Sequence, residues 1–97
     1  MRRCVFRSAA SAEFAAAVAW YESKRVGLGE EFIEEIAGTL RRISGAPVKY
    51  PPVLRDARCA PVKRFPYRIY FRMRAGTIVV LAVFHVRRNP RKWQSRT

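Results

Sequence analysis

The apolar residues in the first half of the chain recur at the spacing of two helices. Those of the first helix share one face and are Phe14, Ala17, Val18 and Tyr21. Those of the second are Phe32, Ile36, Leu40 and Ile43. Gly27 and Gly29 separate the two patterns and Gly45 follows the second. Because glycine commonly ends a helix, the sequence predicts an antiparallel helical hairpin that starts near Ser8.

Strand patterns lie on both sides of this hairpin. Residues 3–7 suit a short strand, and residues 50–52 (Tyr-Pro-Pro) are expected to form a stiff irregular loop. A strand over residues 58–65 contains Pro61 and is expected at a sheet edge, because proline has no N–H for a neighbouring strand.

Two further strands follow in quick succession. Residues 67–74 alternate between apolar and mostly basic positions, which predicts one face on the core and an arginine-bearing face opposite. Residues 77–86 are apolar on both faces, as in a central strand, and Ala75-Gly76 predicts a tight turn between the two.

These elements predict an α+β fold in two layers. The order is strand–helix–helix–strand–strand–strand, with the helical hairpin packed on one face of a mainly antiparallel four-stranded sheet. Residues 1–97 are expected to form a single domain, since this length supports one core, and residues 89–97 form a basic C-terminal tail.

Charge is distributed very unevenly along the chain. Twenty Lys and Arg residues against seven Asp and Glu give a net charge of +13. Residues 1–36 hold five bases and six acids, a net of −1, whereas residues 37–97 hold fifteen bases and one acid, a net of +14. A surface this basic is typical of proteins that meet an anionic partner, such as a nucleic acid or an acidic protein.

Other features exclude several classes of protein. Cys4 and Cys59 are too few for a disulfide framework and lie in no metal-binding pattern. The apolar stretch Ile78–Val86 is too short to cross a bilayer, and the N-terminus lacks the apolar run of a secretion signal. We therefore expect a cytoplasmic protein with no metal, no cofactor and no membrane contact.

Several strings, taken in order, resemble the RelE/ParE toxin superfamily. Trp20-Tyr21-Glu22, then Gly27-Leu28-Gly29 and Phe32, is similar to the helical hairpin of that family. Residues 62–69 (Val-Lys-Arg-Phe-Pro-Tyr-Arg-Ile) are similar to its central hairpin. Residues 83–90 (Val-Phe-His-Val-Arg-Arg-Asn-Pro), followed by Trp93, are similar to the end of its last strand. The resemblance covers essentially the whole chain.

The resemblance carries expectations about fold and function. It implies a sheet in the order 1-4-3-2, with the first strand beside the last and Cys4 and Cys59 on opposite edges. It also implies the toxin of a type II toxin–antitoxin system. Within the superfamily, RelE-like members cut messenger RNA on the ribosome, whereas ParE-like members poison DNA gyrase without RNA chemistry.

A ribonuclease would need a base, an acid and cations around the phosphate. Arg68 and Arg87 match arginines that RelE-like enzymes use there, and a two-residue turn would put Arg68 across from Val83. Arg68, His85 and Arg87 would then share one face, with His85 and Lys63 as candidate bases. However, Trp93 stands where these enzymes often have a tyrosine, and an indole is a donor only.

The favoured prediction is that the protein inhibits gyrase by binding, and the ribonuclease is the alternative. The reason is the ParE-like ending, which consists of Arg87-Arg88-Asn89-Pro90 with Trp93 after it. The residues expected to contact the target or the antitoxin are Arg64, Arg68, Arg72, Arg87, Arg88 and Trp93. Purely structural roles are also possible for two of these residues. His85 could be a hydrogen-bonded, partly buried imidazole, and Trp93 could anchor the tail onto the domain. A third hypothesis is a simple nucleic-acid-binding module, whose affinity for nucleic acid would depend steeply on salt concentration.

In either toxin reading, the partner is a cognate acidic antitoxin. A C-terminal part with a net charge of +14 should attract an acidic chain, whose amphipathic helix would lie across the toxin and which could add a strand at a sheet edge. The expected assembly is a toxin–antitoxin hetero-oligomer.

Overall fold

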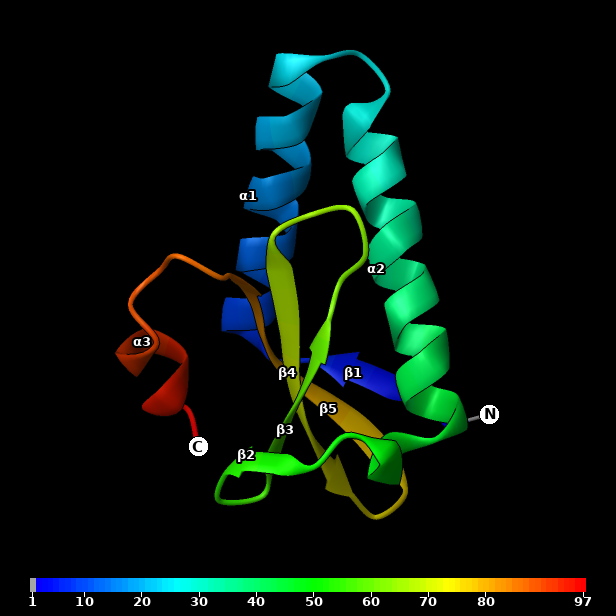
Figure 1. The fold of residues 1–97 in the computed structure, drawn as a ribbon, viewed down its shortest axis with the longest axis vertical. Helices are drawn as coiled ribbons and strands as arrows, with labels where there is room; N and C mark the ends of the chain where they lie inside the picture. The colour runs from blue at the N-terminus through cyan, green and yellow to red at the C-terminus, as the bar shows by residue number, and fades with distance from the viewer. Residues whose placement is uncertain (1) are drawn as a thin grey trace.

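In the computed structural model, which describes residues 2–97, a five-stranded sheet carries two long helices on one face (Figure 1). The elements are β1 (Cys4–Phe6), α1 (Ser8–Lys24), α2 (Leu28–Gly45), the 3-10 helix η1 (Pro47–Lys49), β2 (Pro52–Leu54), β3 (Ala57–Pro61), β4 (Tyr67–Arg74), β5 (Thr77–His85) and α3 (Arg91–Gln94). The predicted α+β class and helical hairpin are confirmed.

The sheet has the order β1-β5-β4-β3-β2, so the prediction of four strands is wrong. The first strand does lie beside the last, in parallel, and the other neighbours are antiparallel. The additional strand is β2, which the sequence analysis assigned in part to an irregular loop. Pro52 fits there because β2 is the sheet edge, where a missing N–H costs no ladder bond.

The strand that contains Pro61 is shorter than predicted and is not the edge. It spans Ala57–Pro61 and lies between β2 and β4. Pro61 pairs with Arg68 of β4, but β2 reaches only as far as Arg58, so the proline faces no strand on its other side. Cys4 in β1 and Cys59 in β3 are both free thiols, with β5 and β4 between their strands.

The helical hairpin is closed by two features of its short connection. Gly27 has a φ of 90°, a conformation that side chains with a Cβ rarely adopt. The Glu22 carboxylate accepts hydrogen bonds from the backbone N–H groups of Gly27 and Gly29, and so caps the start of α2. A Cβ at Gly29 would lie 2.9 Å from the Val18 carbonyl oxygen, so only glycine lets the two helices approach this closely.

The main core lies between the helices and the sheet. Its fully buried side chains come from α2, β4 and β5 and include Phe32, Ile36, Ile43, Ile69, Phe71, Ile78 and Val80. Phe32 stands at its centre, with its ring within about 5 Å of the rings of Tyr21, Phe65 and Tyr67. This aromatic cluster fixes the end of the sheet against the hairpin.

A β-bulge in β5 changes which residues face the helices. Tyr70 pairs with Ala82 and Phe71 pairs with Val80, which leaves Leu81 as the extra residue. Beyond the bulge, Tyr67 lies opposite His85 and Arg68 lies opposite Phe84. The predicted pairing of Arg68 with Val83 is therefore wrong by one residue, because a simple two-residue hairpin contains no bulge.

The sheet face away from the hairpin has its own apolar cluster. Leu81 and Phe84 of β5 and Tyr70 of β4 pack there with Trp93 of α3. The Trp93 indole stacks on the Tyr70 ring at 3.8 Å between centroids, with 16° between the planes. The C-terminal segment thus covers part of this face, which explains why β5 is apolar on both sides, as predicted for a central strand.

Candidate functional site

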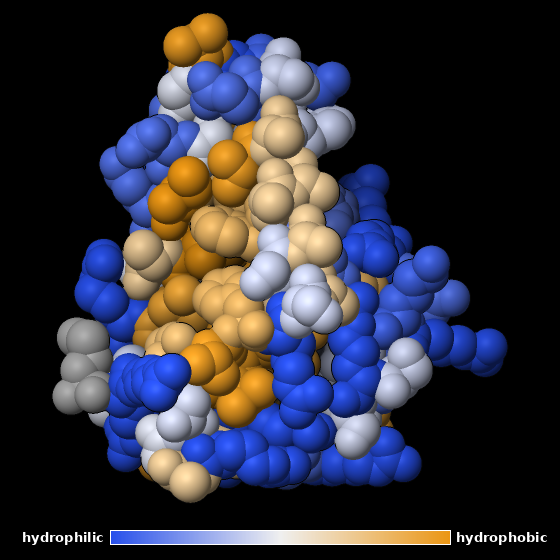
Figure 2. Space-filling view, turned by 180° about the vertical axis from the view of Figure 1, so that it is seen from behind, coloured by the Kyte–Doolittle hydropathy of each residue, from blue (hydrophilic) through white to orange (hydrophobic). Residues whose placement is uncertain are grey.

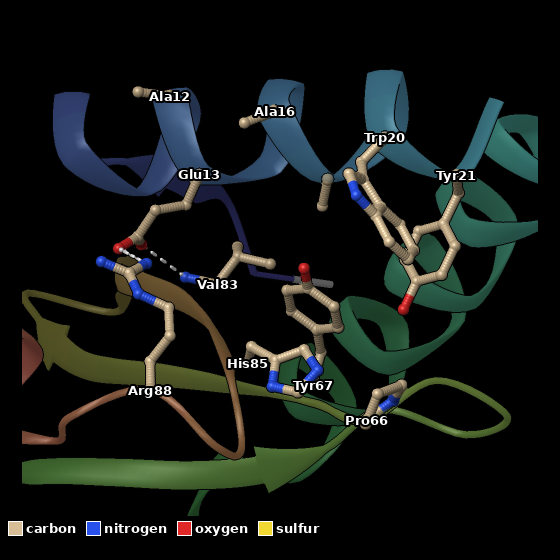
Figure 3. Close-up of a pocket in the computed structure, with 11 residues that line it drawn as sticks. Ala12, Glu13, Ala16, Trp20, Tyr21, Pro66, Tyr67, Val83, His85 and Arg88 are labelled. Carbon is tan, nitrogen blue, oxygen red and sulfur yellow. Dashed lines mark hydrogen bonds and ion pairs between the residues drawn. The ribbon is translucent and has the colours of Figure 1, made fainter. Parts of the chain in front are cut away.

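A groove runs between helix α1 and the adjoining end of the sheet (Figure 3). Its volume is about 730 Å³, and its surface is mostly apolar. The lining residues from α1 are Ala12, Glu13, Ala16, Ala17, Trp20 and Tyr21. Pro66, Tyr67, Val83, His85 and Arg88 line the opposite wall. The size lies within the range of roughly 300–1,000 Å³ that is usual for binding pockets.

The groove exists because α1 has little polar surface. Between Ser8 and Lys24 most of its side chains are small and apolar, and Ala12, Ala16 and Trp20 are exposed. Trp20 has an exposed fraction of 56%, which is high for the largest apolar side chain. Figure 2 shows a further band of apolar surface down the rear of the molecule, between hydrophilic flanks.

Three polar groups stand within this apolar lining. Figure 3 shows the hydroxyl groups of Tyr21 and Tyr67 between α1 and the sheet, with the His85 ring beside Tyr67. Burial raises the pKa of both tyrosines, so both phenols are protonated and able to donate at neutral pH. The His85 Nδ1 accepts a hydrogen bond from the backbone N–H of Arg87, which leaves the hydrogen of the neutral ring on Nε2.

Glu13 joins the groove to the C-terminal segment. Its carboxylate, largely buried, accepts hydrogen bonds from the Val83 backbone N–H and from the guanidinium groups of Arg88 and Arg96. Arg96 also donates to the Leu81 carbonyl oxygen. One acidic side chain on α1 therefore holds β5 and both ends of the segment that follows it.

The predicted ribonuclease residues do not come together. Because of the bulge, His85 faces the groove on the helix side, whereas Arg68 lies on the opposite face beside Tyr70 and Cys59. Arg87 is exposed beyond the end of β5, and Lys63 is exposed in the loop after β3. The expected convergence of Arg68, His85 and Arg87 on one face is wrong.

The five arginines among the predicted contact residues fall into two groups. Arg68 and Arg87 are exposed and form no ion pair within residues 2–97. The others already have acidic partners: Arg64 pairs with Glu31 and Glu35, Arg72 with Asp56, and Arg88 with Glu13. Their roles toward a partner stay predictions.

Trp93 and Arg72 are the least accessible of the predicted contact residues. Their exposed fractions are 4% and 7%. The Trp93 indole N–H and the Arg72 Nε–H are buried and have no hydrogen-bond partner among residues 2–97. With the C-terminal segment in this position, Trp93 anchors the tail onto the far face of the sheet and offers no surface to a partner.

The sequence analysis missed the most connected residue of the site, Glu13, and the groove itself. A signal for both was present, since Glu13 is the lone charged residue in the first half of a helix whose other residues there are Ala, Ser and Phe. The alanine-rich part of α1 that precedes Trp20 also supplies more apolar surface than one core-facing stripe requires.

Two kinds of feature are absent from the described part of the chain. Within residues 2–97, no helix is long and apolar enough to span a membrane. No cluster of three or more His, Cys, Asp or Glu side chains is placed to hold a metal ion in the same range.

The family model and a solved structure that match this chain point to the same kind of protein. Residues 4–90 match the family described as "ParE toxin of type II toxin-antitoxin system, parDE". A chain from the chromosomal ParDE system of P. aeruginosa has a similar fold, with a TM-score of 0.73 and 18% sequence identity. The similar region covers 89% of this chain and 97% of that one. None of the curated proteins matches.

Proposed function

Since the chain belongs to the ParE toxin family of type II toxin–antitoxin systems, we propose that it inhibits DNA gyrase by binding rather than by catalysis. An antitoxin partner follows from membership of a parDE system. We propose that the toxin acts in the cytoplasm. A hetero-oligomer with the antitoxin keeps it neutralised until it is released.

The observation that carries the proposal is the separation of the groups that RNA cleavage would need. Arg68 and His85 lie on opposite faces of the sheet, and the cation that lines the groove with His85, Arg88, is already paired with Glu13. The Nδ1 atom of His85 is already engaged by the Arg87 backbone. Trp93, at the position expected for a proton-transferring tyrosine, is buried in an apolar cluster.

Inhibition of gyrase by binding requires only an accessible basic surface on the toxin. Arg68, Arg87 and Lys63 are exposed and make no ion pair within the described range, so their charges are available to a target. Exposed charges of this kind steer association and fix orientation more than they add affinity. We therefore assign contacts with gyrase to Arg68 and Arg87, the two predicted contact arginines that form no ion pair within residues 2–97.

The test is a supercoiling assay with purified gyrase and relaxed plasmid. The wild-type toxin should block supercoiling or trap cleaved plasmid, and the double variant Arg68→Ala, Arg87→Ala should require at least about tenfold more protein. The matched control is Arg41→Ala, which removes an exposed cation from α2 and should behave as wild type.

Two results would reject this function. The first is a wild-type toxin that leaves gyrase fully active at high excess. The second is codon-dependent cutting of messenger RNA in a translating extract that is abolished by His85→Ala, which would establish the ribonuclease alternative.

A further inference from the structure

We propose that the outer side of α2 binds a second copy of this chain, with the two α2 helices antiparallel about a two-fold axis at Ala37. Each copy inserts its Ile33 into a small pocket of the other copy and pairs its Glu34 with Arg41 of the other copy. This surface is separate from the α1 groove, and the proposed function does not use it.

Ile33 is an exposed apolar side chain on the outer side of α2. In Figure 1 this helix forms one side of the molecule, with α1 and the sheet on its inner side. The exposed fraction of Ile33 is 38%, whereas the other large apolar side chains of α2 are buried or half-buried. One exposed isoleucine is ordinary on its own, but a recess that suits an apolar side chain lies further along the same helix.

This recess is a pocket of about 300 Å³ between α2 and the start of the chain. Its lining residues are Arg2, Cys4, Ala37, Leu40, Arg41 and Ser44. Burial raises the pKa of the Cys4 thiol, so the thiol is neutral and the lining around it is mostly apolar. The Arg2 guanidinium donates a hydrogen bond of 2.8 Å to the Ser44 carbonyl oxygen, which holds this cation beside the pocket.

The exposed isoleucine and the pocket are complementary under a two-fold axis. Ile33, Ala37 and Leu40 recur at helical spacing, so Ile33 and the pocket share one side of α2 with Ala37 between them. In an antiparallel pair centred on Ala37, Ile33 of each copy lies opposite Arg41 of the other, at the pocket. The small side chain of Ala37 lets the two helices approach closely at the axis. Both contacts then close on each other, and none is left open for a third copy.

The charges on this side of α2 favour the same arrangement. Glu30 and Glu34 are the two acids that are not used internally, and both are exposed on the outer side of α2. Arg41, two turns beyond Glu34, is also exposed and forms no ion pair within residues 2–97. Antiparallel packing brings Glu34 of one copy beside Arg41 of the other, whereas an acidic antitoxin or a nucleic acid would meet two free carboxylates here.

The net charge of +13 opposes the association of two copies, but most of it lies away from this surface. The sequence of α2 holds four glutamates and two arginines, a net charge of −2. At about 0.15 M salt, charges more than about 8 Å apart are largely screened, so the close ion pairs persist while the long-range repulsion is weakened. Since one helix pair makes a small interface, we expect a dissociation constant of roughly 10–100 µM. The dilute toxin of the gyrase and unfolding experiments is then monomeric.

The first test is sedimentation equilibrium of the purified toxin over a concentration series that spans this dissociation constant. The wild type should change from monomer to dimer. Ile33→Ala should weaken self-association at least about fivefold, because the side chain that fills the pocket is lost. The matched control is Val53→Ala, which shortens an exposed apolar side chain of β2 and should stay within about twofold of wild type.

Exchanging the two charges tests the antiparallel arrangement itself. Glu34→Arg and Arg41→Glu should each weaken self-association at least about tenfold, because each puts like charges against each other. An equimolar mixture of the two variants should form a heterodimer of roughly wild-type affinity, since each variant carries the charges that the other needs. Arg41→Glu lowers the net charge by two, so overall repulsion alone would make this variant associate more tightly than wild type.

Four results would overturn the assignment of this surface. They are a wild-type toxin that stays monomeric throughout the series, a loss in Val53→Ala as large as that in Ile33→Ala, tighter association of Arg41→Glu, and a mixture that gains no affinity over its components. An unchanged circular dichroism spectrum would show that each variant is folded. Because neither gyrase nor antitoxin is present, failure here is distinguishable from failure of the proposed function.

Discussion

At the scale of single residues, Glu13 connects parts of the chain that are distant in sequence. It lies in the first half of α1, yet its carboxylate holds the Val83 backbone and two arginines of the C-terminal segment, Arg88 and Arg96. Side chains in such a network act together, because each bond orients the next. The position of the C-terminal segment therefore depends on one acid that precedes it by more than seventy residues.

Glu13→Gln should lower the free energy of unfolding by about 1–3 kcal/mol, because hydrogen bonds to a charged acceptor are lost and Arg96 is left without its partner. The measurement is urea denaturation, and trypsin should also cut faster after Arg91 and Lys92. The matched control is Glu34→Gln, since Glu34 is exposed and forms no ion pair within residues 2–97. Equal stability of the two variants would contradict the proposal that Glu13 holds the C-terminal segment in place.

At the scale of elements, the approach of α1 to α2 depends on a missing side chain. Gly29→Ala should destabilise the protein by about 1–3 kcal/mol, because its Cβ would meet the Val18 carbonyl and the Glu22 side chain. Gly45→Ala, in the same helix but with open space around the added carbon, should be neutral or stabilise by up to about 1 kcal/mol. Thermal melts of the two variants test this prediction. A melting temperature that falls in both variants, or rises in both, would refute the packing argument.

The contact of α3 with the sheet gives a second prediction at this scale. Trp93→Ala should cost about 3 kcal/mol, because a large buried ring and its stacking on Tyr70 are lost. Trp93→Phe should cost about 1 kcal/mol or less, since a ring remains and the buried indole N–H, which has no acceptor, is removed. Denaturant midpoints of the two variants should therefore differ clearly, and similar losses would mean that the indole N–H has an unseen partner.

The elements that could be predicted from the sequence are those with a strong period. The helical hairpin follows from Phe14, Phe32 and their spacing, and the central position of β5 follows from its apolar residues on both faces. The short edge strand β2 could not be predicted, because three residues beginning with Pro52 carry no period. Its pairing with β3 is set by tertiary contact instead of by local preference.

The errors at the site have a single physical origin. A bulge adds one residue to β5, at Leu81, without a sequence signal, and every side chain after it changes face. Arg68 and His85 were therefore assigned to a common face that does not exist. The groove was missed for a related reason, because its two walls come from distant segments of the chain, residues 12–21 and 66–88.

At the scale of the whole molecule, five of the seven acids are used internally. Glu13, Glu31, Glu35 and Asp56 each form ion pairs with arginines, and Glu22 caps α2. The remaining cations are left without an opposite charge on this chain. The free toxin thus combines local ion pairs with overall repulsion, and an acidic partner relieves the repulsion without competing for most of the internal acids.

This charge balance determines how the protein responds to acid. The hydrogen bond from Arg64 lowers the pKa of Glu31, and the hydrogen bond from Arg74 lowers the pKa of Asp56. Because the folded pKa values lie below the unfolded ones, the stabilisation is complete above the unfolded values of 4.5 and 3.8. It is lost as the pH falls through the folded values, while the repulsion between the arginines grows.

We therefore expect the wild-type protein to lose stability progressively below about pH 5. Asp56→Asn and Glu31→Gln should be less stable than wild type at about pH 7, and the difference should shrink as the pH falls through the lowered folded pKa values, because the carboxyl groups then become protonated in both states. Urea midpoints measured across this range test the expectation, with Glu34→Gln as the variant that should follow wild type throughout. A difference that is constant with pH would show that the packing of these side chains, and not their charge, supports the fold.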